Sequence, residues 1–96
     1  MMKTVTEAKL EKYFKVTKAA LDMVKEKGLD EKRKDQAVDF LDMAERYYSD
    51  AQHFKKKGDW VTAFAALNYA HGWLDAGARI KLFKVNDSRL FTVDDT

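Results

Sequence analysis

The sequence predicts an all-α fold: an up-down-up antiparallel three-helix bundle followed by an extended C-terminal tail. Three observations predict it. Apolar residues recur at helical spacing through most of the chain, there is no proline, and Gly28 and Gly58 each stand where one amphipathic stretch stops and another begins. Connections of about two or three residues leave successive helices to run antiparallel as neighbours. We therefore expect one helical domain over residues 1–96.

The first helix is expected over residues 5–27. Thr4 can cap it, and Glu7 three residues later completes a capping box. Gly28 suits the left-handed residue that follows a helix end. The positions that form its core-facing stripe are Leu10, Tyr13, Phe14, Thr17, Ala20, Leu21 and Val24.

The second helix is expected over residues 31–57, with Asp30 as its N-cap and Gly58 after its end. Its side chains keep the same helical period, so one face should be buried. That face consists of Ala37, Phe40, Leu41, Ala44, Tyr47, Tyr48, Ala51 and Phe54.

The third helix is expected over residues 60–82, capped by Asp59. Its core face holds Trp60, Ala63, Phe64, Leu67, Ala70, His71, Leu74 and Ala78. Small residues along one side would let another backbone approach closely, namely Ala63, Ala66, Ala70 and Gly77. Residues 83–96 lack helical spacing, and we expect them to form an extended tail laid over the bundle.

Composition narrows the class of protein without selecting a partner. The chain has no cysteine, which rules out disulfides and thiolate metal sites and is typical of a reducing cytoplasm. The net charge is only +2, whereas a dedicated nucleic-acid binder carries a strong excess of positive charge that is clustered on one face. The charged start of the chain resembles no signal peptide, so we expect a cytoplasmic protein without a membrane span.

The third helix carries a second apolar row. Residues 60–74 contain no Lys, Arg, Asp or Glu in a chain that is 35% charged. At about 100° per residue, Leu67 lies at the centre of the core face, and Tyr69, Trp73 and Ile80 lie nearly opposite. They would lie in water unless the tail, a second copy or another protein covers them. The row therefore predicts an interaction surface, for self-association or for a protein partner.

Two histidines are the candidates for chemistry. His71 lies four residues before Asp75, a spacing that suits an acid/base pair or half a metal site, although a lone histidine on a core face is more often structural. His53 points away from the apolar stripe of its own helix, so the two should not meet. With no Cys and no Glu-x-x-His repeat, the sequence predicts no metal or cofactor and does not establish an enzyme.

Arg46 and His53 share the outer face of the second helix. Their spacing resembles the Arg-x(4–6)-His element of the HEPN nucleases, which cleave RNA without a metal ion. An RNA-binding or metal-independent RNA-processing protein is therefore the alternative function. A solvated surface is the simpler interpretation of two residues in a helix rich in Lys and Asp.

A longer pattern runs through residues 48–54, 57–59 and 63–79, with sequences YSDAQHF, KGD and AFAALNYAHGWLDAGAR. It resembles the archaeal family catalogued as domain of unknown function 357. The resemblance implies a compact three-helix bundle from an archaeal cytoplasm, with no established activity. The residues that match the family pattern are Asp50, Asn68, Tyr69, His71, Trp73 and Asp75. Four of these predict a polar seam between the second and third helices, which could instead be a buried network that fixes helix register: Asp50, Asn68, His71 and Asp75.

Overall fold

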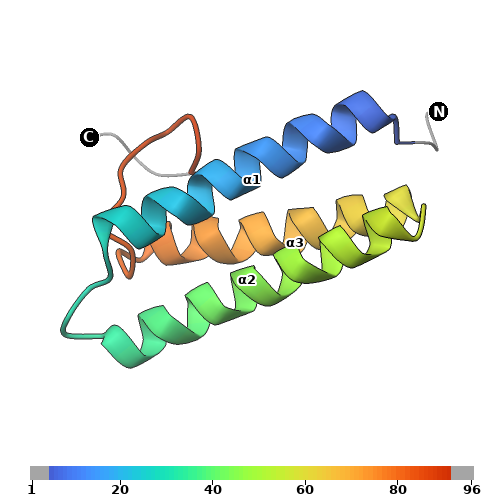
Figure 1. Cartoon of the computed structure of the whole chain (residues 1–96). Coiled ribbons are helices and arrows are strands. Elements are labelled where there is room, and N and C mark those ends of the chain that lie inside the picture. Colours follow the sequence, from blue (N-terminus) through green and yellow to red (C-terminus); the bar gives the residue numbers. More distant parts are fainter. Residues whose placement is uncertain (1–4, 92–96) are drawn as a thin grey trace.

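Three α-helices follow one another in the computed structural model, which describes residues 5–91. They are α1 (Glu7–Lys27), α2 (Lys34–Lys56) and α3 (Trp60–Arg79), and each runs antiparallel to the one before it (Figure 1). α3 is central: it packs along α2 and against α1, whereas α1 and α2 approach each other less closely. The predicted all-α, three-helix fold is confirmed.

α1 begins later than predicted. The hydroxyl of Thr6 accepts a hydrogen bond from the N–H of Lys9 at 3.1 Å, so Thr6 is the N-cap and Glu7 the first helical residue. The predicted cap, Thr4, lies outside the described residues, and the predicted start at residue 5 was wrong. The other end is as predicted, because Gly28 follows Lys27 with a φ of 99°.

α2 begins at Lys34, three residues after the predicted start. Asp30 does accept a backbone hydrogen bond, but from the N–H of Arg33 at 3.0 Å, and this bond closes a turn ahead of the helix. The guanidinium of Arg33 also donates to the carbonyl of Lys81 at 3.1 Å. The turn before α2 is thereby bonded to the chain after α3.

α3 is capped by Asp59, as predicted, through a 3.2 Å hydrogen bond from the N–H of Thr62. It ends at Arg79 and not at the predicted Leu82. The cause is Lys81, whose φ of 63° turns the chain back, so that the N–H groups of Leu82 and Phe83 donate to the carbonyl of Gly77 at 2.8 and 3.3 Å. Both side chains then enter the core.

The chain after α3 is bound to the loop between α1 and α2. Leu29 and Phe83 form an antiparallel bridge. On either side of it, the N–H of Asp30 donates to the carbonyl of Leu82 at 2.8 Å, and the N–H of Lys84 donates to the carbonyl of Gly28 at 3.0 Å. The predicted tail thus lies against the bundle as far as Phe91, where the description ends.

Small residues line the contact between α2 and α3. Each helix buries one of them every seven positions, and in an antiparallel pair the first residue of one set lies level with the last of the other. The small side chains let the two helices approach closely, as predicted for α3. The sets are Ala37, Ala44 and Ala51 on α2, and Ala63, Ala70 and Gly77 on α3.

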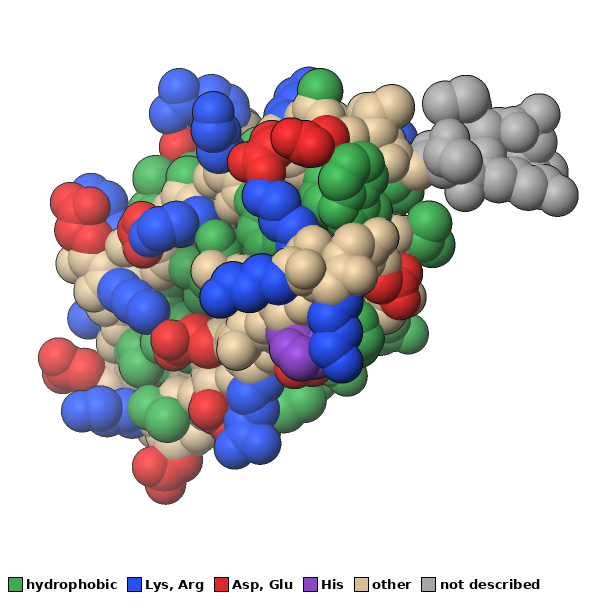
Figure 2. Space-filling model, turned by 45° about the vertical axis from the view of Figure 1, so that its right-hand side comes forward, with side chains coloured by type: hydrophobic (Ala, Val, Ile, Leu, Met, Phe, Trp, Pro, Cys, Tyr) green, Lys and Arg blue, Asp and Glu red, His purple; other side chains and the backbone are tan. Residues whose placement is uncertain are grey.

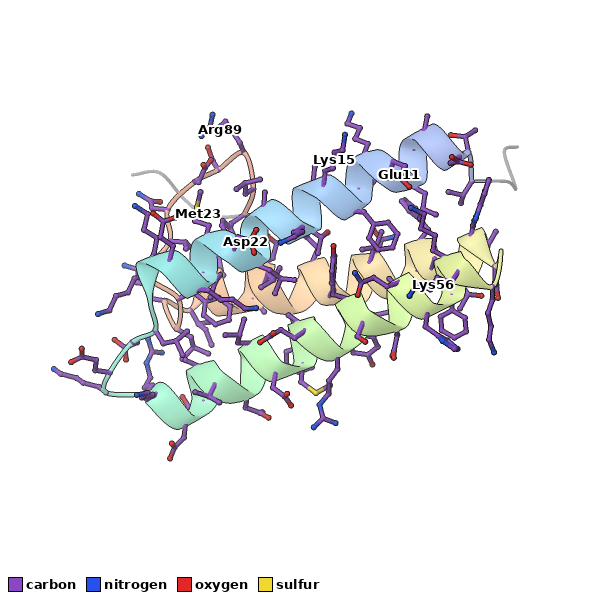
Figure 3. All side chains as sticks on the ribbon, viewed as in Figure 1. Glu11, Lys15, Asp22, Met23, Lys56 and Arg89 are labelled. Atoms are coloured by element: carbon purple, nitrogen blue, oxygen red, sulfur yellow. The ribbon has the colours of Figure 1, made fainter. Side chains whose placement is uncertain are left out.

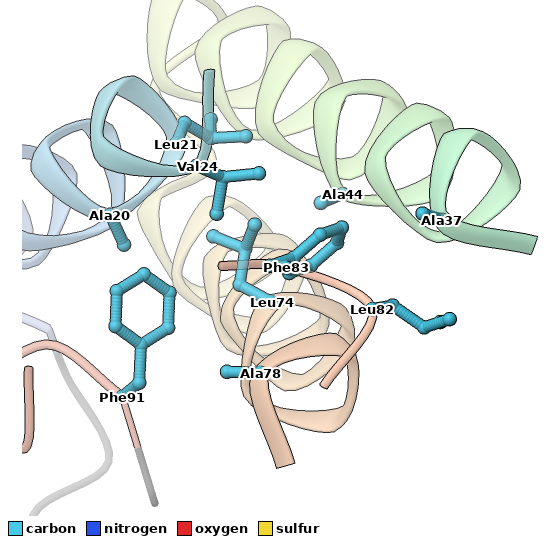
Figure 4. Packing of buried hydrophobic residues seen from close by; sticks show 10 residues of the cluster. All are labelled: Ala20, Leu21, Val24, Ala37, Ala44, Leu74, Ala78, Leu82, Phe83 and Phe91. Atoms are coloured by element: carbon cyan, nitrogen blue, oxygen red, sulfur yellow. The ribbon is translucent and has the colours of Figure 1, made fainter. Parts of the chain in front are cut away.

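Larger side chains from α1 and the tail complete the core. One cluster at the open end of the helical hairpin joins α1, α2, α3 and the tail, and in Figure 4 the ring of Phe83 lies among residues from all three helices. A second cluster lies nearer the α2–α3 turn and includes Leu10, Phe14 and Leu67. Burial of these side chains holds α1 on the α2–α3 pair.

Charged residues border the contact between α1 and α2. Lys25 pairs with Glu45 at 3.1 Å, and Glu11 pairs with Lys55. Figure 3 shows Glu11 and the C-terminal end of α2, marked by Lys56, at the same end of the bundle. Both pairs are partly exposed, so each contributes at most about 1 kcal/mol.

Acidic and basic side chains are interspersed on the face in Figure 2, so no strong field of one sign covers it. Within residues 5–91, none of the helices is both long enough and apolar enough to cross a membrane.

Candidate interaction surface on α3

The outer row of α3 is open to solvent along most of its length. Tyr69 is 63% exposed and Ile80 is 48% exposed, whereas Trp73 is half-buried. Together with smaller neighbours, the two aromatic residues line an open groove of about 610 Å³. We call this the α3 groove, and its lining residues are Ala65, Asn68, Tyr69, Gly72, Trp73 and Ala76.

α2 supports the aromatic walls of the α3 groove. The ring of Tyr47 stacks on Tyr69, with ring centroids 5.2 Å apart and planes 20° from parallel. Phe40 packs edge-on against Trp73 at a centroid distance of 5.0 Å. Such pairs restrain both partners beyond simple burial. Phe40 and Tyr47 were predicted as part of the core stripe of the second helix, but they also support the outer row of α3.

The tail does not cover this surface within the described residues. Phe83 packs into the core beside Gly77, and Phe91 lies near His71 with ring centroids 6.5 Å apart. Tyr69 is 63% exposed although this segment is in place. The tail was one of three segments or partners that the sequence offered as a cover for the outer row. As far as Phe91 it leaves Tyr69 and Ile80 exposed, so that prediction was wrong for these two residues.

Gly72 leaves room for a side chain among the residues that the structure describes. A Cβ atom added there would meet no other atom within 4 Å, whereas one added at Gly77 would run into the ring of Phe83. A glycine inside a helix costs about 0.8–1.0 kcal/mol relative to alanine. At Gly77 the ring of Phe83 offsets that cost, but at Gly72 no contact within residues 5–91 does. The α3 groove thus carries an unfilled, uncharged position that its own fold does not require.

The predicted polar seam is divided by the structure. Asn68, His71 and Asp75 lie together, but on the side of α3 that faces α1, where they line a cavity of about 240 Å³. Asn68 lies at the border of this cavity and lines the α3 groove as well, as does Gly72. Thr17 of α1 lies in the same cavity. Asp50 is exposed on α2 and does not line it. The structure therefore brings three of the four predicted residues together, and it adds Thr17, which the sequence analysis had assigned to an apolar stripe.

Both ring nitrogens of His71 have hydrogen-bond partners. Nε2 is 2.6 Å from the carbonyl oxygen of Leu90, which only accepts, so Nε2 carries the proton. Nδ1 is hydrogen-bonded to the hydroxyl of Thr17 at 3.2 Å, and Asp75 Oδ1 is 3.8 Å from Nε2. Thr17 is only 2% exposed. His71 thereby joins α1, α3 and the tail, and neither nitrogen is open to a substrate or a metal ion.

The remaining candidates lie apart from this cavity. His53 is exposed and contacts Phe54, while Arg46 donates to Asp42 at 2.8 Å. Among residues 5–91 there is no group of three or more His, Asp or Glu side chains arranged to hold a metal ion.

A polar cavity of about 260 Å³ lies between α1 and α2. Lys18 and Asp22 pair across its edge at 3.0 Å, and the hydrogen bond to Asp22 raises the pKa of Lys18. Burial raises the pKa of Tyr48, which also lines this cavity. Both pKa shifts are upward from values of 10 or more, so they move Lys18 and Tyr48 further from titration at neutral pH.

A comparison with protein families assigns the chain. The model of one family, described as a protein of unknown function (DUF357), matches residues 12–83. The chain belongs to the DUF357 family. The resemblance noted in the sequence is thereby confirmed. Neither a search of curated proteins nor a search of solved structures found a match.

The DUF357 match spans α2 and α3 completely and begins within α1. It ends at Phe83, so it includes both the α3 groove and the contact between Phe83 and Gly77. The family carries no assigned activity, and the function has to be argued from the surface itself.

Proposed function

We propose that this DUF357 protein is a small interaction or assembly module, whose docking surface is the outer row of α3 with Tyr69, Trp73 and Ile80. The observation that carries the proposal is Gly72. It is a helical glycine in open space, between braced aromatic walls, in a groove without a charged lining residue. An arriving helix or strand can approach the backbone closely there, and desolvation of the groove costs no buried charge.

The module is proposed to be a single domain that acts in the cytoplasm, in keeping with a chain that lacks cysteine. An RNA-processing role through Arg46 and His53 stays a prediction from the sequence. Arg46 is held by Asp42 on its own helix, and no observation on the described residues favours that role.

Substitution of Gly72 by Arg tests the proposal. The new side chain would fill the groove without disturbing the fold, since the position is open and arginine is a good helix former. Ala19→Arg is the matched control, because Ala19 is exposed on α1. Immobilised wild-type protein and immobilised Ala19→Arg should retain the same binding partners, among which a further copy of the chain is counted. Immobilised Gly72→Arg should not retain them. Retention that is equal in all three, or absent in all three, would contradict the proposal.

A further inference from the structure

We infer that the occupant of the α3 groove is a second copy of this chain. The α3 helix of the second copy would lie antiparallel against α3 of the first copy. The twofold axis that relates them would cross the helices at the level between residues 70 and 71. The inference rests on the proposed function and names its partner. Three features support a second copy: the order of small and large residues along the α3 groove, the absence of charge among its lining residues, and the small size of the contact.

The six lining residues of the groove are arranged symmetrically about that axis. In an antiparallel helix pair, residues that lie opposite each other have numbers with a constant sum, which here equals the sum of 70 and 71. This pairing places the large or polar residues of the groove opposite complementary ones. Tyr69 shares a layer with Gly72 of the second copy, Asn68 with the second copy's Trp73, and Ala65 with the second copy's Ala76. The twofold axis repeats each of these layers.

Three kinds of layer would cover exposed side chains or pair polar groups of the single chain, and the small residues of the Ala65–Ala76 layer would let the two helices approach. The 63% exposed ring of Tyr69 would cover the empty position at Gly72 of the second copy. The amide of Asn68 would accept from the indole N–H of the second copy's Trp73, so the polar groups in the groove gain partners as they lose water. The two outer layers join Val61, 56% exposed, with the second copy's Ile80, 48% exposed.

Charge and area set the strength of the dimer. No lining residue of the groove is charged, so two copies of a chain with net charge +2 bring no like charges together within the groove. A helix of 20 residues is about 30 Å long and about 10–12 Å across with its side chains. A contact made by one face of such a helix is small for a specific interface, which predicts a weak, concentration-dependent dimer.

Sedimentation equilibrium tests the dimer. Wild-type protein and Ala19→Arg should pass from monomer to dimer as the protein concentration rises, as a small interface predicts. Gly72→Arg should remain monomeric at every concentration while its far-UV circular dichroism is unchanged. A wild-type protein that stays monomeric throughout would overturn the inference.

Cysteine cross-linking tests the antiparallel register, and the chain contains no native cysteine to interfere. Ala65 and Ala76 share a layer, so an equimolar mixture of Ala65→Cys and Ala76→Cys should form a mixed disulfide on oxidation. Ala65→Cys alone should not, because in this register the two copies of residue 65 are about 16 Å apart along the axis, whereas a disulfide needs Cα atoms within about 7 Å. Cross-linking of Ala65→Cys with itself would overturn the antiparallel register.

The outcomes separate this inference from the proposed function. If the wild-type protein is monomeric but retains a different protein in a manner that Gly72→Arg abolishes, the docking surface stands and the second copy is wrong. If it is monomeric and retains nothing that depends on Gly72, both the second copy and the proposed function are wrong.

Discussion

The two glycines of α3 that lie in the helix interior allow one substitution to be tested in opposite environments. Gly77 faces the ring of Phe83, and a Cβ atom there would lie 2.6 Å from two of the ring carbons. Carbon atoms in contact normally sit about 3.5–4.0 Å apart, so the ring has to move. Phe83 is 2% exposed, and its backbone is bound to Gly77 and bridged to Leu29, which leaves it little freedom to do so.

The expected loss at Gly77→Ala follows from these contacts. Moving the ring within the core, or partly out of it, costs about 2–4 kcal/mol, between the values for overpacking and for loss of a buried Phe. The better helix propensity of alanine returns about 0.8–1.0 kcal/mol. The free energy of unfolding should therefore fall by about 1–3 kcal/mol, which lowers Tm by about 5–20 °C in a domain of this size.

Gly72→Ala is the matched control on the same helix. Its Cβ meets nothing, so only the helix propensity acts, and the free energy of unfolding should rise by about 0.5–1 kcal/mol. Urea and thermal unfolding, followed by far-UV circular dichroism at a concentration that keeps the chain monomeric, measures both variants. If both substitutions stabilise the protein equally, Phe83 does not lie on Gly77, and the placement of the tail is wrong.

Three further predictions concern the residues that fix the tail and α1. Thr17→Val removes the hydroxyl that is hydrogen-bonded to His71 and should lower the free energy of unfolding by about 1–2 kcal/mol in urea titrations; an unchanged value would contradict the hydrogen bond. Phe91→Ala should cost about 3–5 kcal/mol, while Arg89→Ala, on an exposed side chain, should change stability by less than about 0.5 kcal/mol; equal effects would mean that Phe91 is not buried. Burial raises the pKa of Tyr48 above its usual 10.0, so the folded state holds the phenol proton more tightly than the unfolded chain does. The resulting stabilisation is complete below pH 10 and disappears as the pH rises through the folded pKa. Tyr48→Phe should therefore flatten the loss of stability in that range, and an unaltered pH profile would refute this.

The helices could be predicted from the sequence because a period of 3.6 residues marks a buried face directly. Their ends could be predicted less well. Thr4 and Thr6 are both competent caps, and the pattern does not choose between them. The turn before α2 depends on a hydrogen bond from Arg33 to Lys81, far along the chain, and the end of α3 depends on the unusual φ of Lys81. Local patterns hold no signal for either.

The outer row of α3 could be predicted because wheel angle alone separates Tyr69 from Leu67. Its support by Phe40 and Tyr47 could not, because it depends on how closely α2 approaches α3. The position of the polar residues depends on the side of the α2–α3 pair to which α1 docks. Helix periodicity does not contain that handedness, so His71 was expected to face α2 and lies towards α1 instead.

The docking role of the α3 groove can be tested most directly by ¹⁵N–¹H correlation spectra over a dilution series. The account predicts concentration-dependent shifts at the amides of Tyr69 and Gly72 and at the indole N–H of Trp73, with none on the exposed faces of α1 and α2. The same series on Gly72→Arg should show no shifts. Shifts that map to α1 or α2, or a wild-type spectrum that is identical at all concentrations and with candidate partners added, would contradict the claim that α3 carries the interaction surface.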